Sequence, residues 1–301
     1  MLLHLADASD CCGAKAEMIY RISRFSDGYE YVTLPKSRIF STTYYNEKIR
    51  SLNNADEIRR LVQIEILPHV RREFKPSPLV IRSSATCEDS ALFSGAGVYE
   101  SFLNLTTDEQ IANAIVKVYG SFQTDNARFY AHFNSVNYND ESIAILVQEL
   151  APVITSGVLF TIDPITYAND VVIEYTTGLG DKVVSGDSTI IGGRFSKTQP
   201  IEESKTFLLA LIDFALNFEK ELKCPIDIEW GCNDSCVYIF QVRPIVKSVL
   251  TRDCSTSICD GQFVVTSVIQ VEISLRKEVT KWGFGCAISV RKSAYAEKSI
   301  I

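Results

Sequence analysis

An apolar strand pattern runs directly into an arginine and a glycine-containing loop within residues 79–105, LVIRSSATCEDSALFSGAGVYESFLNL. An apolar run that ends at Ile81 and is bounded by turn-forming residues is typical of a buried strand, so Arg82 is expected at a strand end. The loop residues that leave the backbone open to phosphate oxygens are Ser94, Gly95, Ala96 and Gly97. A guanidinium beside such a loop supplies charge-assisted hydrogen bonds, and the segment therefore predicts a polyphosphate site. A glycine turn beside a surface salt bridge is the alternative.

The same segment resembles the motif VRSSATAEDxxxxSFAGxxxTFLN of a known nucleotide-binding domain. This domain, an ATP-grasp fold, is shared by phosphoenolpyruvate synthase, pyruvate phosphate dikinase and rifampicin phosphotransferase. The resemblance extends without a gap from Val80 to Leu105, with Gly95 in place of a phenylalanine and Ser101 in place of a phosphate-side threonine. It implies that residues 94–97 and Ser101 bind the nucleotide and that Arg82 holds its phosphates.

Three further blocks resemble the same family in the same order along the chain. Residues 156–166 and 170–186 resemble SGVLFTxDPxT and VVIEAxxGLGExVVSG, with Asp181 in place of the usual glutamate. Residues 225–245 resemble PQDIEWAxxxGxLYxLQxRPI, and the GAK of residues 13–15 stands where the family has GGK. Asp181 either faces a metal ion or caps the turn after GLG.

Single positions carry further roles if the resemblance holds. It implies that Lys15 is a flexible phosphate-binding lysine, and that Gln148 and Leu150 lie in the hinge beside the adenine base. For Lys15 the alternative is a solvated charge. For Gln148 the alternative is an exposed polar residue that ends a buried strand.

The block at residues 225–245 predicts a hairpin on its own residues. PIDIEW and VYIFQVRPI alternate polar with apolar residues around the turn-rich GCNDSC. Strand periodicity places Asp227 and Glu229 on one face of the first strand. It places Ile239, Gln241 and Arg243 on one face of the second. If these are the same face, Glu229 lies opposite Ile239 or Gln241.

This hairpin predicts a metal and phosphate site. The oxygens of Glu229 and Gln241 suit Mg²⁺, which takes hard oxygen ligands and bridges nucleotide phosphates. Arg243 can neutralise charge that develops during phosphoryl transfer. A solvated outer face of an edge hairpin is the alternative.

Composition is typical of a folded cytosolic enzyme, with 46% hydrophobic and 22% charged residues among 301. A net charge of −7 argues against nucleic acid as the main partner. The first residues lack the basic start of a signal peptide, and the apolar stretch 207–216 is too short for a membrane span, so it is expected to be a buried helix. The nine cysteines include no CxxC pair, which favours reduced structural thiols and a cytoplasmic location.

The resemblance implies an α/β fold of the ATP-grasp type. Residues 1–143 form an N-terminal lobe and residues 144–245 a C-terminal lobe with ATP between them, and residues 246–301 are an unassigned tail. Helical periodicity is expected at residues 55–74 and 108–122.

The expected activity is the ATP half-reaction of a dikinase-type kinase. In the resembling enzymes the acceptor histidine stands in a TSHxA-type motif, and none of the three histidines here does. The histidine is therefore expected on a separate domain or partner chain. The alternative is a noncatalytic ATP/AMP-binding or scaffolding module, or a truncated remnant of such an enzyme.

Overall fold

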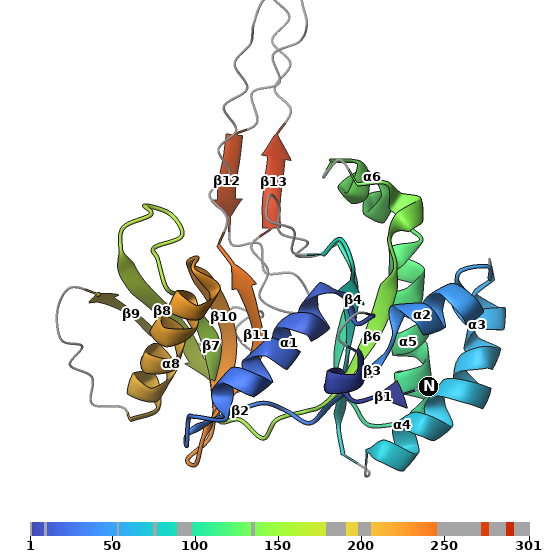
Figure 1. Cartoon of the computed structure of the whole chain (residues 1–301), viewed down its shortest axis with the longest axis horizontal. Coiled ribbons are helices and arrows are strands. Elements are labelled where there is room, and N and C mark those ends of the chain that lie inside the picture. The colour runs from blue at the N-terminus through green and yellow to red at the C-terminus, as the bar shows by residue number, and fades with distance from the viewer. Residues whose placement is uncertain are drawn as a thin grey trace, which may run out of the picture.

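Two β-sheets with helices packed against them form the body of the protein in this computed structural model (Figure 1). The structure describes residues 2–8, 11–52, 54–74, 77–88, 98–133, 136–178, 191–197, 206–245, 272–276 and 287–291. The α/β class predicted from the sequence is confirmed.

The first sheet has its strands in the order β1-β3-β6-β4-β5, with every neighbouring pair antiparallel. Its strands are β1 (Leu2–Leu3), β3 (Ser37–Phe40), β6 (Ile143–Glu149), β4 (Leu79–Ala85) and β5 (Ser101–Leu105). The helical segments of this part of the chain are η1 (Leu5–Ala8), α2 (Thr42–Tyr44), the π turns Tyr45–Ile49 and Val62–Ile66, α3 (Ala55–Leu61), α4 (Leu67–Glu73), α5 (Asp108–Phe122), α6 (Asp125–Phe133) and the 3₁₀ turn Tyr138–Asp140.

Helices α3 to α5 bury their apolar faces against this sheet. Ile58, Val70 and Ile115 belong to one core cluster with the strand residues Ile81 and Ile145. Helix α5 begins with a capping box. The Thr107 hydroxyl accepts from the Gln110 amide, and the Gln110 side-chain oxygen accepts from the Thr107 amide. The helices predicted at 55–74 and 108–122 are therefore confirmed, the former with a π turn inside it.

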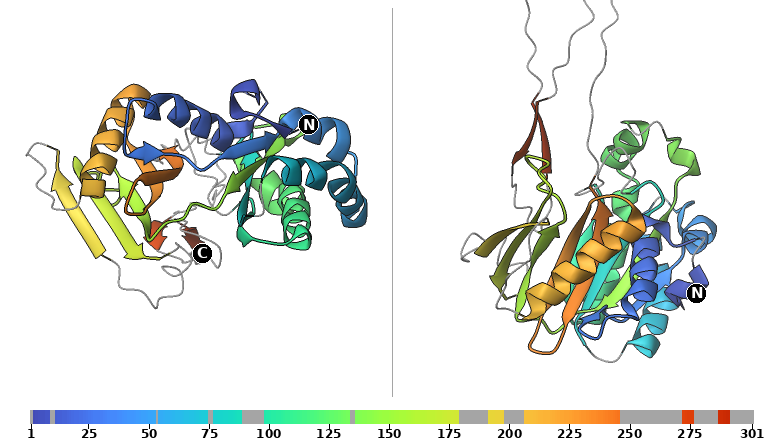
Figure 2. Two further views of the ribbon diagram at one scale, coloured as in Figure 1. Left: turned by 90° about the horizontal axis from the view of Figure 1, so that it is seen from below. Right: turned by 60° about the vertical axis from the view of Figure 1, so that its left-hand side comes forward.

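The second sheet has the order β2-β11-β10-β7-β8-β9. Its strands are β2 (Val32–Thr33), β11 (Val237–Pro244), β10 (Ile226–Cys232), β7 (Thr155–Phe160), β8 (Asp170–Thr177) and β9 (Ile191–Ser196). Helices α1 (Gly13–Ser26) and α8 (Thr206–Leu222) lie side by side along one face of it (Figure 2). Because Leu211 and Phe214 of α8 are fully buried there, the buried helix predicted at 207–216 is confirmed.

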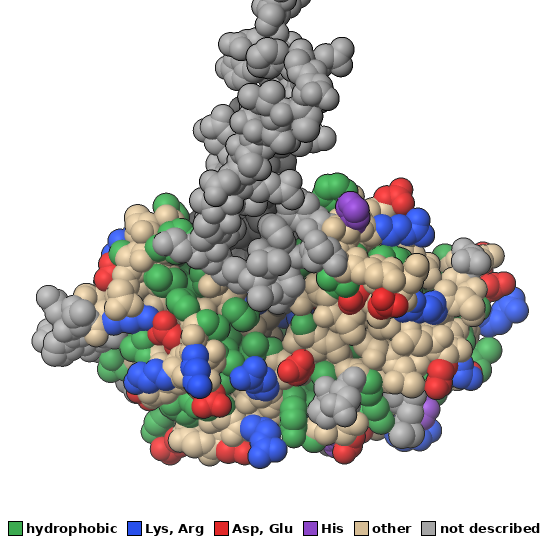
Figure 3. All heavy atoms as spheres, turned by 45° about the horizontal axis from the view of Figure 1, so that its top comes forward, with side chains coloured by type: hydrophobic (Ala, Val, Ile, Leu, Met, Phe, Trp, Pro, Cys, Tyr) green, Lys and Arg blue, Asp and Glu red, His purple; other side chains and the backbone are tan. Residues whose placement is uncertain are grey.

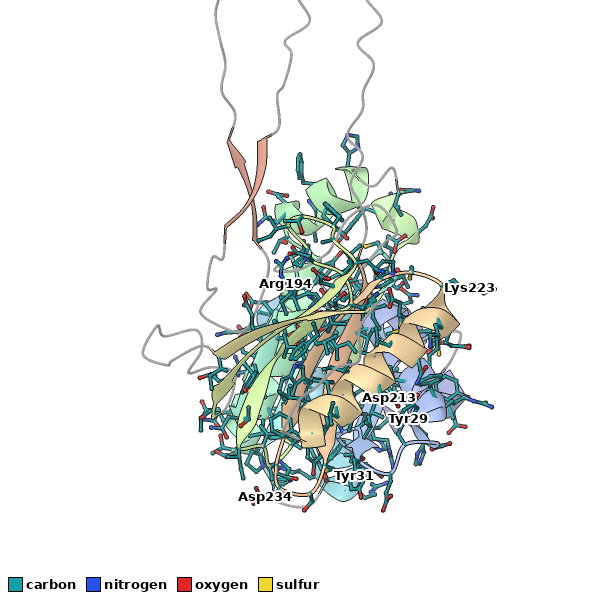
Figure 4. The ribbon with its side chains drawn as sticks, turned by 90° about the vertical axis from the view of Figure 1, so that its left-hand side faces the viewer. Tyr29, Tyr31, Arg194, Asp213, Lys223 and Asp234 are labelled. Carbon is teal, nitrogen blue, oxygen red and sulfur yellow. The ribbon has the colours of Figure 1, made fainter. Side chains whose placement is uncertain are left out.

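The turn between β10 and β11 lies beside the segment that leads into β2. Figure 4 shows Asp234 of this turn near Tyr31, and the Val237 amide donates to the Tyr31 carbonyl over 2.7 Å. This contact ties the hairpin to the residues that enter the connection between the two sheets.

Arg82 does not lie at a strand end, which corrects the prediction from the apolar run. Strand β4 continues to Ala85, because β6 offers it a partner at every position from Glu149 opposite Leu79 to Ile143 opposite Ala85. Arg82 thus lies in mid-strand, opposite Leu146.

A β-bulge in the β10–β11 hairpin changes the expected set of residues on one face. Glu229 pairs with Gln241, but Trp230 pairs with Ile239, so Phe240 is the extra residue. Ile239 therefore points with Trp230 into the core under α1 and α8, opposite to Gln241. The prediction that Ile239 shares a face with Gln241 is wrong for this reason.

Three connections join the sheets: the segment with η1 and α1 between β1 and β2, the segment between β2 and β3, and the segment between β6 and β7. The division of the chain at residues 143 and 144 stays a prediction, and β6 itself hydrogen-bonds within the first sheet. Beyond residue 245 the described strands β12 (Glu272–Arg276) and β13 (Ala287–Arg291) form an antiparallel pair. No helix in the described part of the chain is both long and apolar enough to cross a bilayer.

Candidate nucleotide-binding site

Side chains from both sheets meet in a charged group that we call the interlobe cluster, formed by Arg82, Glu229, Gln241 and Arg243. Arg82 Nη1 of β4 donates to Gln241 Oε1 of β11 over 3.2 Å and is 3.4 Å from the Phe240 carbonyl oxygen. Arg82 Nη2 lies 3.6 Å from Glu229 Oε2. The hairpin predicted from the sequence thus presents its carboxylate and amide to the arginine of the other sheet.

Glu229 is shared between two guanidinium groups. Arg243 Nη2 donates to Glu229 Oε1 over 3.0 Å, because the odd-numbered residues of the hairpin strands share a face at this end. Burial lowers the pKa of Arg82, and the neighbouring Glu229 carboxylate acts against this change. Arg82 Nε is buried without a hydrogen-bond partner among the residues that the structure describes. The cluster therefore has a donor available to an anionic ligand.

One face of the molecule carries charges of both signs. On the face shown in Figure 3, acidic and basic side chains are interspersed over both lobes. The charged side chains of the interlobe cluster are less exposed than these, at 12% for Arg82, 13% for Arg243 and 19% for Glu229.

Lys15 lies in the first turn of α1. There it contacts Ser83 of β4 and Glu88, which lies in the turn that follows β4. Its ammonium donates to Glu88 Oε1 over 2.5 Å and to Ser83 Oγ over 3.1 Å. Lys15 and Glu88 are 9% and 2% exposed. The alternative of a solvated charge does not describe this lysine.

Gly13 allows α1 to start this close to β4. Its φ is +71°, in the left-handed region, and a Cβ there would overlap the Ser84 carbonyl oxygen. The Ser84 hydroxyl donates to the Cys12 carbonyl over 2.7 Å and accepts from the Ala16 amide over 3.0 Å. These contacts fix the start of the helix that carries Lys15.

A cavity of about 400 Å³ lies where the β2–β3 and β6–β7 connections run past the start of β11. We call it the hinge cavity, and its walls include Thr33, Leu34, Lys36, Leu150, Cys236 and Tyr238. Tyr238 pairs with Gly231, two residues from Glu229, so it lies on the same face of the hairpin as Gln241. The hinge cavity and the interlobe cluster are thus on one face, separated by roughly 10 Å along β11.

The remaining predicted binding residues fall in different places. Leu150 lines the hinge cavity, whereas the Gln148 amide donates to Ser37 Oγ over 2.9 Å within the first sheet. Ser101, the first residue of β5, lies opposite Arg82. Ser94, Gly95, Ala96, Gly97 and Asp181 lie outside the described residues.

The donors of the cluster fit Mg²⁺ only together with a phosphate ligand. Glu229 and Gln241 present a carboxylate and an amide oxygen at paired positions, and both are hard oxygen donors. Within the described residues no group of three or more His, Cys, Asp or Glu side chains could hold a metal ion. Phosphate oxygens and water would therefore complete the coordination shell.

Comparison with known proteins identifies the family. Residues 41–191 match the family described as pyruvate phosphate dikinase, AMP/ATP-binding domain. The chain belongs to this family. The ATP-grasp arrangement that the sequence predicts agrees with this membership and with the two connected sheets.

Two relatives illustrate how much of the family's proteins the chain covers. It is 32% identical over 200 residues to a rifampicin phosphotransferase of Bacillus cereus, which covers 55% of this chain and 23% of that protein. It is 29% identical over 206 residues to a probable phosphoenolpyruvate synthase of Archaeoglobus fulgidus, which covers 58% of this chain and 27% of that protein. The chain thus spans about a quarter of the length of these relatives.

Among solved structures, an acetyl-coenzyme A synthetase of Ca. Korarchaeum cryptofilum aligns with a TM-score of 0.40 and 13% identity. The alignment covers 77% of this chain and 92% of that chain.

Two residues of the site were missed by sequence reasoning. The sequence predicts no role for Glu88, and it predicts Tyr238 only as part of a strand. The family motif places an acid at the position of Glu88, which is a signal that could have drawn attention to it. Tyr238 lies three residues before Gln241, so simple alternation would place the two side chains on opposite faces of the strand. Only the bulge at Phe240 brings them to the same face.

Proposed function

We propose that this chain binds Mg–ATP between its two sheets and transfers a phosphoryl group to a histidine on a separate domain or partner chain. The observation that carries the proposal is the contact of Arg82 from the first sheet with Gln241 and Glu229 from the second. A buried, charged contact between two lobes is costly unless its groups gain further partners, and a bound polyphosphate supplies them. Membership of an AMP/ATP-binding domain family supports the same ligand.

The two parts of the site suit the two ends of ATP. The hinge cavity is lined by Leu150 and Tyr238, which offer apolar and aromatic surface to the base. Arg82, Arg243 and Lys15 supply the positive charge for the phosphates. Because Tyr238 and Gln241 share a face of β11, one extended ligand can reach both parts.

In the transfer step the chain's residues align and neutralise charge. The histidine nitrogen forms a bond to phosphorus as the bond from that phosphorus to the bridging oxygen breaks. Negative charge grows on the leaving oxygen, and Arg243 and Arg82 stabilise it by charge-assisted hydrogen bonds. Glu229 and Gln241 are the residues that would hold Mg²⁺, which would supply positive charge to offset that of the phosphates.

Binding is tested first. Titration calorimetry with ATP at millimolar concentration should detect one site, and Mg–ATP should raise the melting temperature. A ligand that binds only the folded protein stabilises it by about 2.7 kcal/mol at a hundredfold excess over its Kd. A folded protein that shows no heat and no thermal shift refutes the site.

Transfer is tested with a partner. The chain is incubated with ATP labelled at the β or the γ phosphate and with the isolated phosphohistidine domain of a phosphoenolpyruvate synthase. Label on that domain, lost when its histidine is replaced by alanine, is the expected result. If ATP binds but no such domain is labelled, the chain acts as a noncatalytic ATP/AMP-binding or scaffolding module.

A further inference from the structure

Lys15 is held by an internal partner before any ligand arrives. Its ammonium lies 2.5 Å from Glu88 Oε1 and 3.1 Å from Ser83 Oγ. The other carboxylate oxygen, Glu88 Oε2, accepts from the Ala85 amide over 3.2 Å. Both ends of the pair are thereby anchored to the last residues of β4.

The pair is unusual because it is buried on both sides. The Lys15 and Glu88 side chains are 9% and 1% exposed. Burying an ion pair takes two charges out of water, so such a pair is weak evidence of added stability and calls for another reason. Lys197 and Glu219 form a pair of similar length, 2.6 Å, with side chains that are 14% and 19% exposed.

The Lys15 ammonium keeps a free donor. Of its three N–H groups, two are used by Glu88 and Ser83, and the third has no partner among the described residues. Ser83, which accepts from Lys15, directly follows Arg82 in β4, and the Glu88 charge is among those that act on the pKa of Arg82. The Lys15 pair therefore lies close to the interlobe cluster.

We propose that Glu88 is a positioning residue that holds the Lys15 ammonium in place for the nucleotide phosphates. This inference rests on the proposed function. A lysine side chain has four rotatable bonds, and ordering it on binding would weaken affinity. Glu88 and Ser83 order it beforehand, so that the remaining N–H meets a phosphate oxygen without that loss.

The test is a double-mutant cycle on Mg–ATP affinity, measured by titration calorimetry on the folded protein. The variants are Glu88→Gln, Lys15→Met and the two combined. Glu88→Gln should weaken binding about tenfold, the scale of ordering one long side chain. In the Lys15→Met background the same change should have no effect, because Glu88 acts through Lys15.

The matched control is Glu219→Gln, which removes the carboxylate of the Lys197 pair and should leave Mg–ATP affinity unchanged. If Glu88→Gln does not fold, Ser83→Ala is used in its place. Ser83→Ala should weaken Mg–ATP binding less than Glu88→Gln, and it should have no effect in the Lys15→Met background.

Two outcomes overturn the proposal alone: wild-type affinity in the Glu88 variant, or an equal loss with and without Lys15. If the wild-type chain binds no Mg–ATP, the proposed function fails and this inference fails with it.

Discussion

Replacing Glu229 by glutamine separates nucleotide binding from phosphotransfer. The carboxylate lies 3.0 Å from Arg243 and 3.6 Å from Arg82, and its side chain is 19% exposed. Two guanidinium groups and one carboxylate carry a net charge of +1, which becomes +2 in the variant. Leaving buried like charges without their partner costs about 3 kcal/mol, the lower end for a buried pair because Glu229 keeps some contact with water.

The effect on the ligand should differ between affinity and rate. ATP affinity should change less than about tenfold, because Lys15, Arg82 and Arg243 still meet the phosphates and the added positive charge offsets the lost metal ligand. Phosphotransfer should fall by about 10² to 10³, since the metal and phosphates lose the alignment that is needed in the transition state.

Calorimetry with ATP in the presence and absence of Mg²⁺, together with labelled transfer to a histidine domain, measures both quantities. Mg²⁺ should strengthen ATP binding to the wild type and do so much less in the variant. Glu174→Gln is the matched control, because Glu174 pairs with Val158 on the same sheet face as Glu229 but two strands away. Normal phosphotransfer and normal Mg²⁺ dependence in Glu229→Gln, or equal losses in Glu174→Gln, would refute the assignment.

Three further changes test other parts of the site. Arg82→Lys should weaken Mg–ATP binding by about tenfold, because lysine keeps the charge but lacks the fork that reaches Gln241 and Glu229 together; calorimetry showing unchanged affinity contradicts this. Gly13→Ala should lower the free energy of unfolding, measured by urea denaturation, by more than about 2 kcal/mol. The reason is that alanine is strained at a φ of +71° and its Cβ would overlap the Ser84 carbonyl oxygen. The control Gly28→Ala should show little change, because a Cβ there meets nothing within 4 Å. The amides of Thr166 and Ile165 lower the pKa of Asp163, so its contribution to stability is complete above the unfolded value, about pH 4, and is lost as pH falls through the folded value. The difference in unfolding free energy between wild type and Asp163→Asn should therefore be smaller at about pH 3 than at about pH 6, and a difference that stays constant would contradict it.

The hairpin was the part of the site that sequence could predict best. Strand periodicity and a short turn constrain which residues pair, and Glu229 opposite Gln241 was one of two options. The other option failed because the bulge at Phe240 turns Ile239 into the core. A bulge inserts one residue without a marked change in local composition, so the alternation of residue types does not reveal it.

Longer-range contacts could not be read from periodicity. The apolar run before Arg82 predicts where β4 begins. Where β4 ends depends on its pairing with β6, which lies about sixty residues further along the chain. Glu88 and Lys15 are 73 residues apart in sequence, and nothing in either neighbourhood predicts their contact. That contact arises because Gly13 lets α1 begin against the end of β4.

The charges of the site suggest the order in which its ligands arrive. Lys15, Arg82 and Arg243 carry three positive charges, and Glu88, Glu229 and Asp227, which pairs with Arg243, carry three negative ones. A divalent cation alone would have to displace guanidinium groups from its two protein oxygens, because Arg82 donates to Gln241 and Arg243 donates to Glu229. A triphosphate offers the guanidinium groups other acceptors, so that the Glu229 and Gln241 oxygens become free to bind the cation. Mg²⁺ is therefore expected to enter with the nucleotide, and calorimetry with MgCl₂ alone should detect no binding at concentrations that saturate the ATP complex.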